Sequence, residues 1–355
     1  MSSTSIPAGH HLAAILQSKD SHGTLTLHNR ETPSPGPGGI LIDVKSIALN
    51  PIDNYQRDRG ILPINYPAVL GSDIAGKIIS VGSEVKNSTF RPGTRVAAFA
   101  PCFFTKGAPD YGAFQTKVLV PAINVCPLPE NLSYNQGALL PMAVLTAWSG
   151  WYTIGVSRNT CFNAADKKGM LVWGAASSVG STTVQIARMM GYTVYATASR
   201  KDHEYLRGLG VARLFDYADH DVVEQIISTA RSDGVTVQTG YDAVGAVEPC
   251  LQILKRLRGK EETVARLAAA ATHVTETSPK VDGVQWEFVS APKDQEERDR
   301  HFEFIFNVWL KEKLERNEFF PSPRIQVVGG GLKAVNEALD ILKNGVSLTK
   351  IVLEV

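Results

Sequence analysis

The sequence predicts an α/β fold in which a doubly wound parallel sheet is inserted into a mostly β unit. In the middle of the chain, short apolar strands alternate with helices, an order that builds a parallel sheet covered by helices. A turn of small residues, from Val172 to Gly180, follows the first of these strands. Short β segments lie before about residue 120 and again at 348–355. We therefore expect the C-terminal segment to return to the first unit.

The N-terminal part predicts strands because Gly and Pro break its short apolar segments. The expected strands lie at residues 13–16, 39–48, 75–81, 94–99 and 115–121. Helical periodicity begins at Asn135 and continues to Trp151, and Pro141 is expected to kink or divide this helix.

The middle part is expected to form the parallel sheet, from about residue 168 to about residue 291. Its strands are predicted at residues 170–173, 192–198, 213–217, 235–241 and 286–292, with helices between most of them. The alanine-rich stretch 257–271 is predicted as helix and loop. Amphipathic helices at 302–314 and 331–343 precede a closing strand.

The composition is that of an ordinary globular protein of 355 residues, with 44% hydrophobic residues and a net charge of +1. Such a chain lacks the broad basic field that nucleic acids or anionic membranes attract. No apolar run approaches the roughly 20 residues that span a bilayer, and the polar N-terminus 1–7 lacks a signal core. The four cysteines show no C-x-x-C pairing, which favours a reducing, cytoplasmic location.

The turn between Val172 and Gly180 is typical of a dinucleotide site. Its small residues let the backbone approach a pyrophosphate, and the helix that follows presents unpaired N–H groups to it. The strict G-x-G-x-x-G pattern is absent, since the turn reads Gly174-x-x-Ser177-x-x-Gly180. Small residues between a strand and a helix also serve as a simple packing device, and this alternative stays open.

The second strand of this unit is followed by Ser199, Arg200 and Lys201. NAD-binding versions of the motif place an acid there, which binds the ribose 2′-hydroxyl. A hydroxyl and two cations suit a 2′-phosphate instead, so we expect NADPH rather than NADH. The alternative is a solvated helix start, the usual environment of exposed cations. Tyr217 and Val244 follow further strands, where ligands of a doubly wound sheet bind.

Several other stretches match a known family. They are residues 50–55 (Asn-Pro-Ile-Asp-Asn-Tyr), 67–76, 111–114, 145–147, 242–245 and 337–345. With them the chain resembles the medium-chain dehydrogenase/reductase superfamily, in its zinc-free quinone-oxidoreductase and enoyl-reductase branch. The likeness is greatest with fungal enoyl-reductase-like proteins that act in trans with polyketide synthases. The resemblance implies a GroES-like catalytic domain (1–140), a Rossmann NADPH-binding domain (141–291) and a segment returning to the catalytic domain (292–355).

The resemblance also separates this chain from the zinc alcohol dehydrogenases. Those members carry a Cys where this chain has the segment Asn50–Asp53, and a Gly-His-Glu where it has Gly71-Ser72-Asp73. A zinc site needs several converging Cys, His or carboxylate ligands. The remaining candidates, His10, His11, His22 and His28, are expected to be solvated, so the sequence predicts no metal.

The implied reaction is transfer of a hydride from NADPH to the β-carbon of an α,β-unsaturated carbonyl or enoyl thioester. The resemblance places Asn50, Pro51, Ile52, Asp53, Val346 and Ser347 near the nicotinamide, and Thr146 between nicotinamide and substrate. It places Gly174, Ala176, Ser177, Ser178, Val179 and Val244 along the dinucleotide, and Ser199, Arg200, Lys201 and Tyr217 at the adenosine end.

Tyr55 is the candidate proton donor or oxyanion partner, because a phenol can donate a hydrogen bond and a proton in a dry site. The alternative is a core tyrosine at the end of a strand. Asn50 is also a catalytic candidate, although asparagine before proline commonly forms a turn. Tyr217 has a plain alternative too, as a half-buried strand-end tyrosine.

The expected substrate wall is apolar, although each of its residues is also a plausible core residue. It consists of Leu139, Leu140, Pro141, Met142, Ala143, Phe103 and Phe288. The polar loop 105–110 is expected to be mobile and to gate the cleft. An acyl-carrier protein would need a basic docking patch, for which the candidates are Lys45, Arg57, Arg59 and Lys106. The strand at 284–289 would either extend the sheet across a homodimer or remain the edge of a monomer.

Three functions remain open from the sequence. The first is an NADPH-dependent enoyl reductase of secondary metabolism. The second is a general quinone or enone oxidoreductase. The third, of another class, is an NADPH-binding partner protein without turnover.

Overall fold

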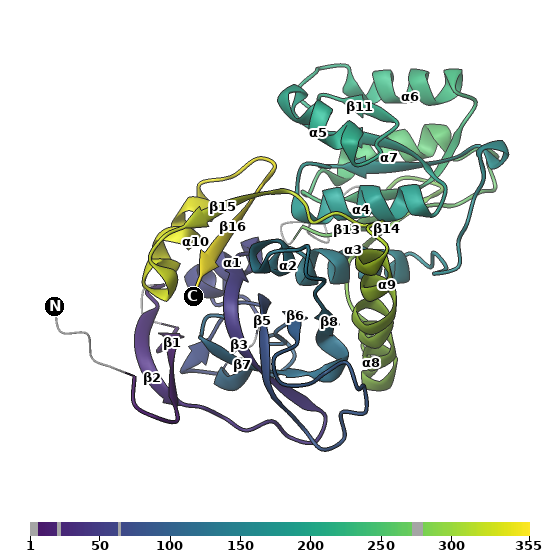
Figure 1. The fold of residues 1–355 in the computed structure, drawn as a ribbon. Helices are drawn as coiled ribbons and strands as arrows, with labels where there is room; N and C mark the ends of the chain where they lie inside the picture. The colour runs from purple at the N-terminus through teal and green to yellow at the C-terminus, as the bar shows by residue number, and fades with distance from the viewer. Residues whose placement is uncertain (1–5, 20–22, 63–64, 272–279) are drawn as a thin grey trace. The chain divides into compact units, whose positions relative to one another are not determined.

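The computed structural model describes residues 6–19, 23–62, 65–271 and 280–355 (Figure 1). His22 and the first five residues, on which two of the expectations above fall, lie outside this part. The chain divides into two compact units, one of Met1–Met142 with Asp299–Val355 and one of Ala143–Arg298.

The second unit contains a six-stranded parallel sheet. Its strands are β9 (Lys168–Trp173), β10 (Thr193–Thr197), β11 (Arg213–Phe215), β12 (Thr236–Asp242), β13 (Ala265–Ala269) and β14 (Val284–Phe288). They lie in the order β11-β10-β9-β12-β13-β14. The chain builds outward from β9 to one edge, then returns beside β9 and builds to the other edge. This is the doubly wound Rossmann order, and it confirms the predicted fold class.

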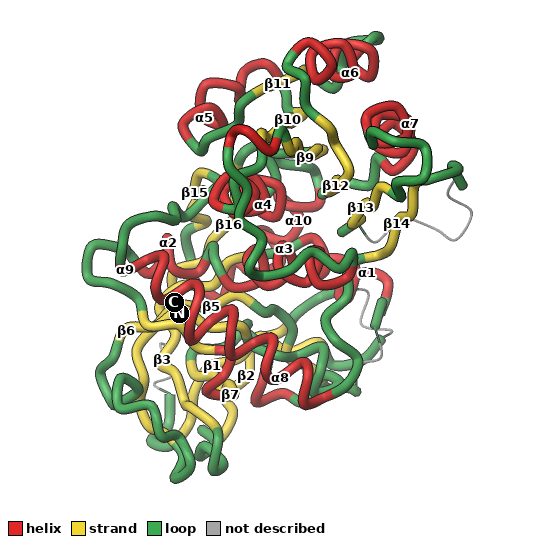
Figure 2. Tube along the Cα trace, turned by 90° about the vertical axis from the view of Figure 1, so that its right-hand side faces the viewer, coloured by secondary structure: helices red, strands yellow, loops and turns green. Residues whose placement is uncertain are grey.

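Helices cover both faces of the parallel sheet. They are α3 (Pro141–Thr153), α4 (Ser178–Met189), α5 (His203–Gly208), α6 (Val222–Ser232) and α7 (Val247–Leu257). Figure 2 shows α4 on one side of the sheet and α6 and α7 on the other. Buried aliphatic side chains of α6, α7 and the strands form the core between them.

One predicted element of this unit is wrong. The stretch 257–271 was expected to be helix and loop, but residues Ala265–Ala269 form β13 between β12 and β14. Alanine favours helices in isolation, but four of these five residues are fully buried in the interior of the sheet. Tertiary burial outweighs local propensity here.

The first unit is mainly antiparallel. Its larger sheet has the order β15-β16-β3-β5-β6-β8, with β7 also paired to β3, and its smaller sheet has the order β2-β1-β4. The strands are β1 (His10–Leu16), β2 (Thr26–Glu31), β3 (Gly39–Ala48), β4 (Ala68–Val69), β5 (Asp73–Val81), β6 (Arg95–Phe99), β7 (Lys117–Pro121), β8 (Val125–Pro127), β15 (Arg324–Val328) and β16 (Thr349–Glu354). The pairing of β16 with β3 places the end of the chain in this unit (Figure 1).

A helix that the sequence did not predict follows β3. Helix α1 (Pro51–Arg59) begins with proline in its first turn and ends at Gly60, whose φ of 60° is left-handed. Asp53 accepts a hydrogen bond from the backbone N–H of Asn50 at 2.8 Å, which stabilises the helix start. Tyr55 therefore lies inside a helix and not at the end of a strand, where its alternative interpretation as a core tyrosine placed it.

The histidines correct a second expectation. His10 and His11 lie in β1 and His28 lies in β2, rather than in loops. His11 is buried, and its Nε2 lies 2.8 Å from Oε1 of Gln115, so it is a hydrogen-bonded core residue. The continuous apolar run that follows, from Leu12 to Leu16, was the signal for this strand.

Four further helices are α2 (Tyr134–Ala138), α8 (Gln295–Glu303), α9 (Lys311–Glu315) and α10 (Val335–Lys343). A π-helical segment, Phe304–Leu310, joins α8 to α9. Among the described residues, the helices are all too short or too polar to cross a membrane.

Candidate functional site

The turn after β9 has the geometry that a pyrophosphate needs. Ser177 is the N-cap of α4, and its Oγ accepts from the N–H of Gly180 at 3.0 Å while donating to the carbonyl of Gly174 at 2.9 Å. The N–H groups of Ser178 and Val179 lie in the first helical turn, where no intrahelical acceptor exists. An anion placed there would meet these donors and the positive end of the helix dipole.

The two glycines of this turn have measurable reasons to be glycine. Gly174 has a φ of 81°, and a Cβ on it would lie 2.5 Å from Cγ1 of Val244. A Cβ on Gly180 would lie 2.2 Å from the carbonyl oxygen of Gly174, so this residue allows the helix to pack against the strand end. The serine at position 177 caps the helix, which explains why a middle glycine is not required.

The residues predicted for the 2′-phosphate gather at the ends of β10 and β11. Oγ of Ser199 lies 3.0 Å from the hydroxyl of Tyr217, which is 53% exposed. Arg200 and Lys201 follow directly and are exposed. Tyr217 is therefore an exposed residue of this cluster, and the alternative of a half-buried strand-end tyrosine is wrong.

Sequence reasoning missed the acids of this cluster. Nη2 of Arg200 donates to both carboxylate oxygens of Asp219, at 3.1 and 3.2 Å, and its backbone N–H donates to Asp216. The N–H of Ala218 and the hydrogen bond and charge of Arg200 hold the pKa of Asp216 below its usual range. The sequence Asp216-Tyr-Ala-Asp219 after a strand was the signal that could have revealed them.

Two other predicted residues of this unit have defined surroundings. Val244, 43% exposed, follows Asp242, whose Oδ1 accepts from the N–H groups of Val244 and Gly245. The carbonyl of Thr146 in α3 accepts a hydrogen bond from the buried hydroxyl of Tyr241 at 2.8 Å. Complete burial raises the pKa of Tyr241 well above its usual value, so this hydroxyl stays a donor.

The first unit holds a buried polar cluster built from segments far apart in sequence. Asn50 comes from the loop before α1, Asp73 from the start of β5, and Lys350 from β16. Their exposed fractions are 5%, 0% and 3%. Nζ of Lys350 donates to Oδ1 of Asn50 at 2.5 Å and to Oδ2 of Asp73 at 3.2 Å. The sequence analysis included Asn50 and missed the role of Lys350.

Three donors surround the carboxylate of Asp73. Its Oδ2 accepts from Nδ2 of Asn50 at 2.9 Å and from Lys350, and its Oδ1 accepts from the backbone N–H of Met142 at 2.6 Å. Burial raises the pKa of Asp73, and these donors and the ammonium oppose that rise. Because every partner is a donor, the ionised form is the one that the site satisfies.

Asp53 adjoins this cluster through the backbone of Asn50 and has a different environment. Its Oδ2 accepts one hydrogen bond from Asn50, and its Oδ1 has no partner within the described part of the chain. Desolvation in a fully buried position raises its pKa to about 7. Asp73 and Lys350 therefore form the ion pair, and Asp53 is the carboxyl that takes up a proton as the pH falls through about 7.

Comparisons with known proteins give a matching family in each of the two units of the chain. The family described as alcohol dehydrogenase GroES-like domain matches residues 36–130, and the family described as zinc-binding dehydrogenase matches residues 178–277. The chain is 47% identical over 348 residues to the trans-enoyl reductase tndF of Aspergillus flavipes, covering 98% of this chain and 99% of that protein. It is 46% identical over 293 residues to the trans-enoyl reductase tazE of Aspergillus terreus, covering 82% and 95%.

A solved structure of an alcohol dehydrogenase superfamily protein from Novosphingobium aromaticivorans has the same fold. Its TM-score is 0.78 at 22% identity, and the match covers 97% of this chain and 99% of that one. The chain belongs to the medium-chain dehydrogenase/reductase superfamily. The predicted resemblance is thus confirmed, and this dehydrogenase/reductase is an oxidoreductase with a nicotinamide cofactor.

The zinc-binding name of one matching family raises the question whether this dehydrogenase/reductase has the ligands for zinc. Among the described residues, no group of three or more His, Cys, Asp and Glu side chains could hold a metal ion. Ser72 lies beside Cys102, with Oγ and Sγ 3.6 Å apart, and burial raises the pKa of this thiol to about 12. A neutral thiol, a hydroxyl and a carboxylate already paired with Lys350 do not fit zinc.

Tyr55 lies on α1 and is half-buried. The guanidinium carbon of Arg59, one turn further along, lies 5.2 Å from the centre of its ring. Tyr55 therefore stands two residues from Asp53 on the element that also carries the Asn50 cap. The guanidinium of Arg59 thus contacts the ring of Tyr55 and not its hydroxyl.

The predicted substrate wall includes residues of different exposure. Leu139, Leu140, Pro141 and Ala143 are buried, Met142 and Phe103 are half-buried, and Phe288 is 46% exposed at the end of β14. Phe103 and Phe104 belong to an aromatic cluster with Phe99, whose ring centre lies 6.3 Å from each of theirs. The predicted wall residue Phe103 is therefore part of an aromatic cluster of the first unit.

The loop 105–110, expected to be mobile, is held at its end. Asp110 pairs with Arg30 at 2.7 Å, and the carbonyl of Pro109 accepts from the side chain of Gln115 at 2.7 Å. Gln115 also binds His11, which ties the loop to the buried histidine of β1. These contacts argue against free movement of residues 109 and 110.

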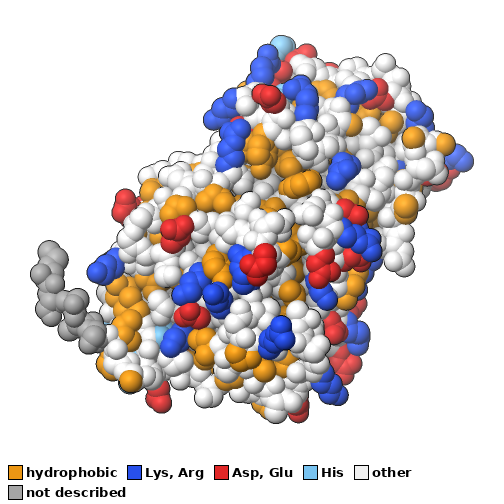
Figure 3. Space-filling model, in the orientation of Figure 1, with side chains coloured by type: hydrophobic (Ala, Val, Ile, Leu, Met, Phe, Trp, Pro, Cys, Tyr) orange, Lys and Arg blue, Asp and Glu red, His pale blue; other side chains and the backbone are white. Residues whose placement is uncertain are grey.

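One candidate for the basic docking patch is excluded. Arg57 is 6% exposed and pairs with Asp58 and Asp340, at 2.7 Å each, so it is not a surface cation. Lys45 pairs with Asp43 at 2.8 Å. On the face shown in Figure 3, acidic and basic side chains are interspersed, and no field of one sign is seen.

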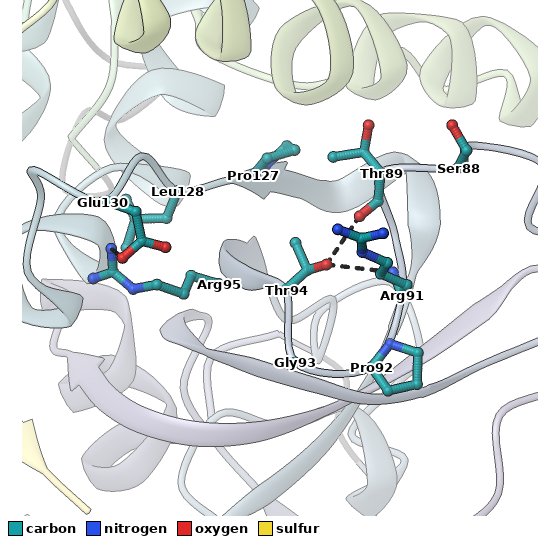
Figure 4. Close-up of a pocket in the computed structure, with 10 residues that line it drawn as sticks. All are labelled: Ser88, Thr89, Arg91, Pro92, Gly93, Thr94, Arg95, Pro127, Leu128 and Glu130. Carbon is teal, nitrogen blue, oxygen red and sulfur yellow. Dashed lines mark hydrogen bonds and ion pairs between the residues drawn. The ribbon is translucent and has the colours of Figure 1, made fainter.

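A surface depression of about 700 Å³ lies in the first unit (Figure 4). It is lined by Ser88, Thr89, Arg91, Pro92, Gly93, Thr94, Arg95, Pro127, Leu128 and Glu130. The guanidinium of Arg95 donates to the carbonyls of Pro129 and Leu132, so it is already hydrogen-bonded to the backbone beside the depression. None of the sequence-predicted site residues lines this depression.

Proposed function

We propose that this enzyme uses NADPH to reduce the carbon–carbon double bond of an α,β-unsaturated carbonyl or enoyl thioester in polyketide or other secondary metabolism. The observation that carries the proposal is 47% identity, over nearly the full chain, to a trans-enoyl reductase. When bound, the cofactor supplies a hydride to the β-carbon, and the carbonyl oxygen takes the enolate charge. The protein must then bind the cofactor, donate hydrogen bonds to that oxygen and provide a proton.

The preference for NADPH rests on the cluster at the ends of β10 and β11. Ser199 and Tyr217 offer two hydroxyls 3.0 Å apart, and Arg200 and Lys201 offer two exposed cations. A 2′-phosphate can accept from all four side chains, whereas a 2′-hydroxyl has no use for two cations. The acid that usually binds the 2′-hydroxyl of NADH is replaced by these residues.

The other cofactor residues are proposed from their position in the fold. Gly174, Ala176, Ser177, Ser178, Val179 and Val244 would hold the pyrophosphate and neighbouring ribose. Asn50, Pro51, Ile52, Asp53, Thr146, Val346 and Ser347 would adjoin the nicotinamide end. Leu139, Leu140, Pro141, Met142, Ala143, Phe103 and Phe288 remain the proposed apolar substrate residues. Tyr55 remains the proposed proton donor.

The experiment that tests this function is NADPH oxidation by the purified protein, dialysed against a chelator. The acceptors are enoyl thioesters of several chain lengths, simple quinones and aldehydes, with NADH measured in parallel. Turnover of an enoyl thioester with NADPH supports the proposal. Turnover of quinones alone would identify a general quinone oxidoreductase instead. Tight NADPH binding with no acceptor reduced would favour a partner protein without turnover.

The substrate carrier and assembly state belong to the same proposal. We propose that the acyl group arrives as a thioester, either on a carrier protein or on coenzyme A. Comparing turnover of one acyl chain on the two carriers distinguishes them. The protein is proposed to act as a monomer or homodimer, which sedimentation measures directly. All four cysteines are free, which suits the reducing cytoplasm that we propose as its location.

A further inference from the structure

The amide of Asn50 can be oriented from its partners alone. An ammonium group only donates hydrogen bonds, and an ionised carboxylate only accepts them. Oδ1 of Asn50 therefore faces Lys350, at 2.5 Å, and Nδ2 faces Asp73, at 2.9 Å. The reverse orientation would set two donors against each other on one side and two acceptors on the other. The buried ion pair thus fixes the direction of this amide.

One hydrogen of the amide remains available. Nδ2 of Asn50 carries two N–H bonds, and the structure gives it one acceptor, Asp73, among the described residues. The amide lies in a cluster where Lys350 and Asp73 are almost fully buried. A donor that is fixed before the substrate arrives, in surroundings shielded from water, stabilises developing negative charge more strongly than a mobile donor in water. The ammonium of Lys350 adds a positive charge directly behind the amide.

We propose that Lys350 is a positioning residue, which with Asp73 holds the second amide N–H of Asn50 as a hydrogen-bond donor to the carbonyl oxygen of the bound enoyl substrate. This inference rests on the proposed function. In this proposal the amide of Asn50, held in place by Lys350, stabilises the negative charge on the enolate oxygen. Both described acceptors of Lys350 belong to the cluster, so in this proposal the lysine acts through Asn50.

The arrangement also explains how three polar side chains are tolerated in the core. Lys350 balances the charge of Asp73, and Asn50 bonds to both of them. Replacing Lys350 alone would leave an unpaired buried carboxylate, which strongly destabilises a fold. The informative variant therefore changes both charges together, as Lys350→Met with Asp73→Asn. The matched control removes the less buried pair Lys313–Glu318, whose side chains are 20% and 44% exposed, as Lys313→Met with Glu318→Gln.

The experiment measures kcat and KM for an enoyl thioester, together with the dissociation constant of NADPH. Removing one preorganised donor typically costs about 10²–10³ in kcat. We expect the buried-pair variant to lose roughly a hundredfold in kcat on this scale, with NADPH binding changed less than about threefold. The single variant Lys350→Arg, which keeps the positive charge, should lose less kcat than the pair variant. The control pair variant should leave both kcat and NADPH binding unchanged.

A double-mutant cycle separates positioning from general destabilisation. Because Lys350 acts through Asn50, the pair substitution should have almost no further effect on kcat in an Asn50→Ala background. An independent readout is the side-chain amide resonance of Asn50, identified by its loss in Asn50→Ala. It should show two well-separated, slowly exchanging protons in the wild type and faster exchange in the pair variant.

The outcomes are distinguishable. A wild type that reduces no enoyl thioester overturns the proposed function, and the substrate oxygen as acceptor with it. An active wild type whose pair variant keeps more than half of its kcat overturns only the role of Lys350. The role of Lys350 is also overturned if the pair substitution lowers kcat by the same factor in the Asn50→Ala background as in the wild type. It is overturned as well if NADPH binding weakens as much as kcat falls.

Discussion

Asp219 accepts hydrogen bonds from Nη2 of Arg200 with both carboxylate oxygens, at 3.1 and 3.2 Å. The cation proposed for the 2′-phosphate thus has an acidic partner within the chain itself. The side chain of Arg200 is 72% exposed, so it can exchange this partner for a phosphate without disturbing the core. The acid and the phosphate would compete for one guanidinium.

The first prediction concerns Arg200→Ala. Hydrogen bonds to charged groups contribute about 1.5–3 kcal/mol, so we expect NADPH to bind roughly tenfold to a hundredfold more weakly. NADH should be little affected, since it lacks the phosphate. The measurement is the dissociation constant of each cofactor by fluorescence titration. The control is Arg207→Ala, which removes another exposed arginine of the same unit. Equal weakening of NADPH and NADH would refute the phosphate role.

The second prediction concerns the competing acid. Asp219→Asn should tighten NADPH binding several-fold because it removes the nearer of the two acids that pair with Arg200 and a negative charge near the phosphate. NADH binding should stay the same. Titrations at low and high salt report the change in the charged contact. Asp221→Asn, which removes the same charge two residues away, is the control and should have a smaller effect. Weaker NADPH binding in Asp219→Asn would mean that the acid holds Arg200 in place for the cofactor.

The third prediction concerns the turn after β9. Ser177→Ala removes the N-cap of α4, and such a loss typically costs about 1 kcal/mol in the free energy of unfolding. Urea unfolding measures this loss, and Ser178→Ala is the control because its neighbour supplies the cap. NADPH and NADH should both bind more weakly in Ser177→Ala, since the cap orders the turn that meets the pyrophosphate. An unchanged unfolding midpoint would show that the hydrogen bond of Ser177 contributes no stability.

Much of the fold could be predicted because it is encoded locally. Alternating apolar segments locate β3, β5 and β6 within a few residues, and the turn from Gly174 to Gly180 marks the start of the parallel sheet. The strand β13 could not be predicted, because its alanines become strand-like only when β12 and β14 bury them. Helix α1 was missed although Pro51 and Gly60 signal its ends.

The candidate site likewise has one part that is encoded locally and one part that depends on contacts between distant segments. The cofactor turn is a local motif, so its residues are adjacent in sequence and visible there. The cluster of Asn50, Asp73 and Lys350 joins residues as much as 300 positions apart, and only the pairing of β16 with β3 brings Lys350 near Asn50. A single lysine in an apolar strand, Thr349–Glu354, was the one available signal for it.

The fourth prediction concerns Tyr55 as proton donor. Tyr55→Phe removes the hydroxyl and keeps the ring that Arg59 covers, so the fold should be unaffected. General acid catalysis contributes typically 10²–10⁴, and we expect kcat to fall by about a hundredfold with NADPH binding unchanged. Turnover of an enoyl thioester measures this directly. Unchanged turnover would exclude Tyr55 as the donor and leave water or another group to supply the proton.

The fifth prediction concerns the stability of the protein as a function of pH. Burial raises the pKa of Asp53 to about 7 in the folded chain, against an ordinary pKa of 3.8 for an aspartate carboxyl. Between these values the folded state binds a proton that the unfolded state has lost, so the free energy of unfolding falls as pH rises. Each unit of difference is worth about 1.4 kcal/mol, and the total is therefore several kcal/mol. Below about pH 4 and well above pH 7 this contribution no longer changes.

Asp53→Asn tests this because its side chain cannot ionise and can still accept from the N–H of Asn50. Relative to the wild type, the variant should gain stability from pH 5 to about pH 7, and the gain should level off towards pH 8. Urea unfolding at several pH values provides the difference. Glu84→Gln, which changes an exposed carboxyl of the same unit, should show no such trend. If the difference between Asp53→Asn and wild type is the same at pH 5 and pH 8, then Asp53 is ionised throughout this range. The proton would then belong to a different group of the cluster.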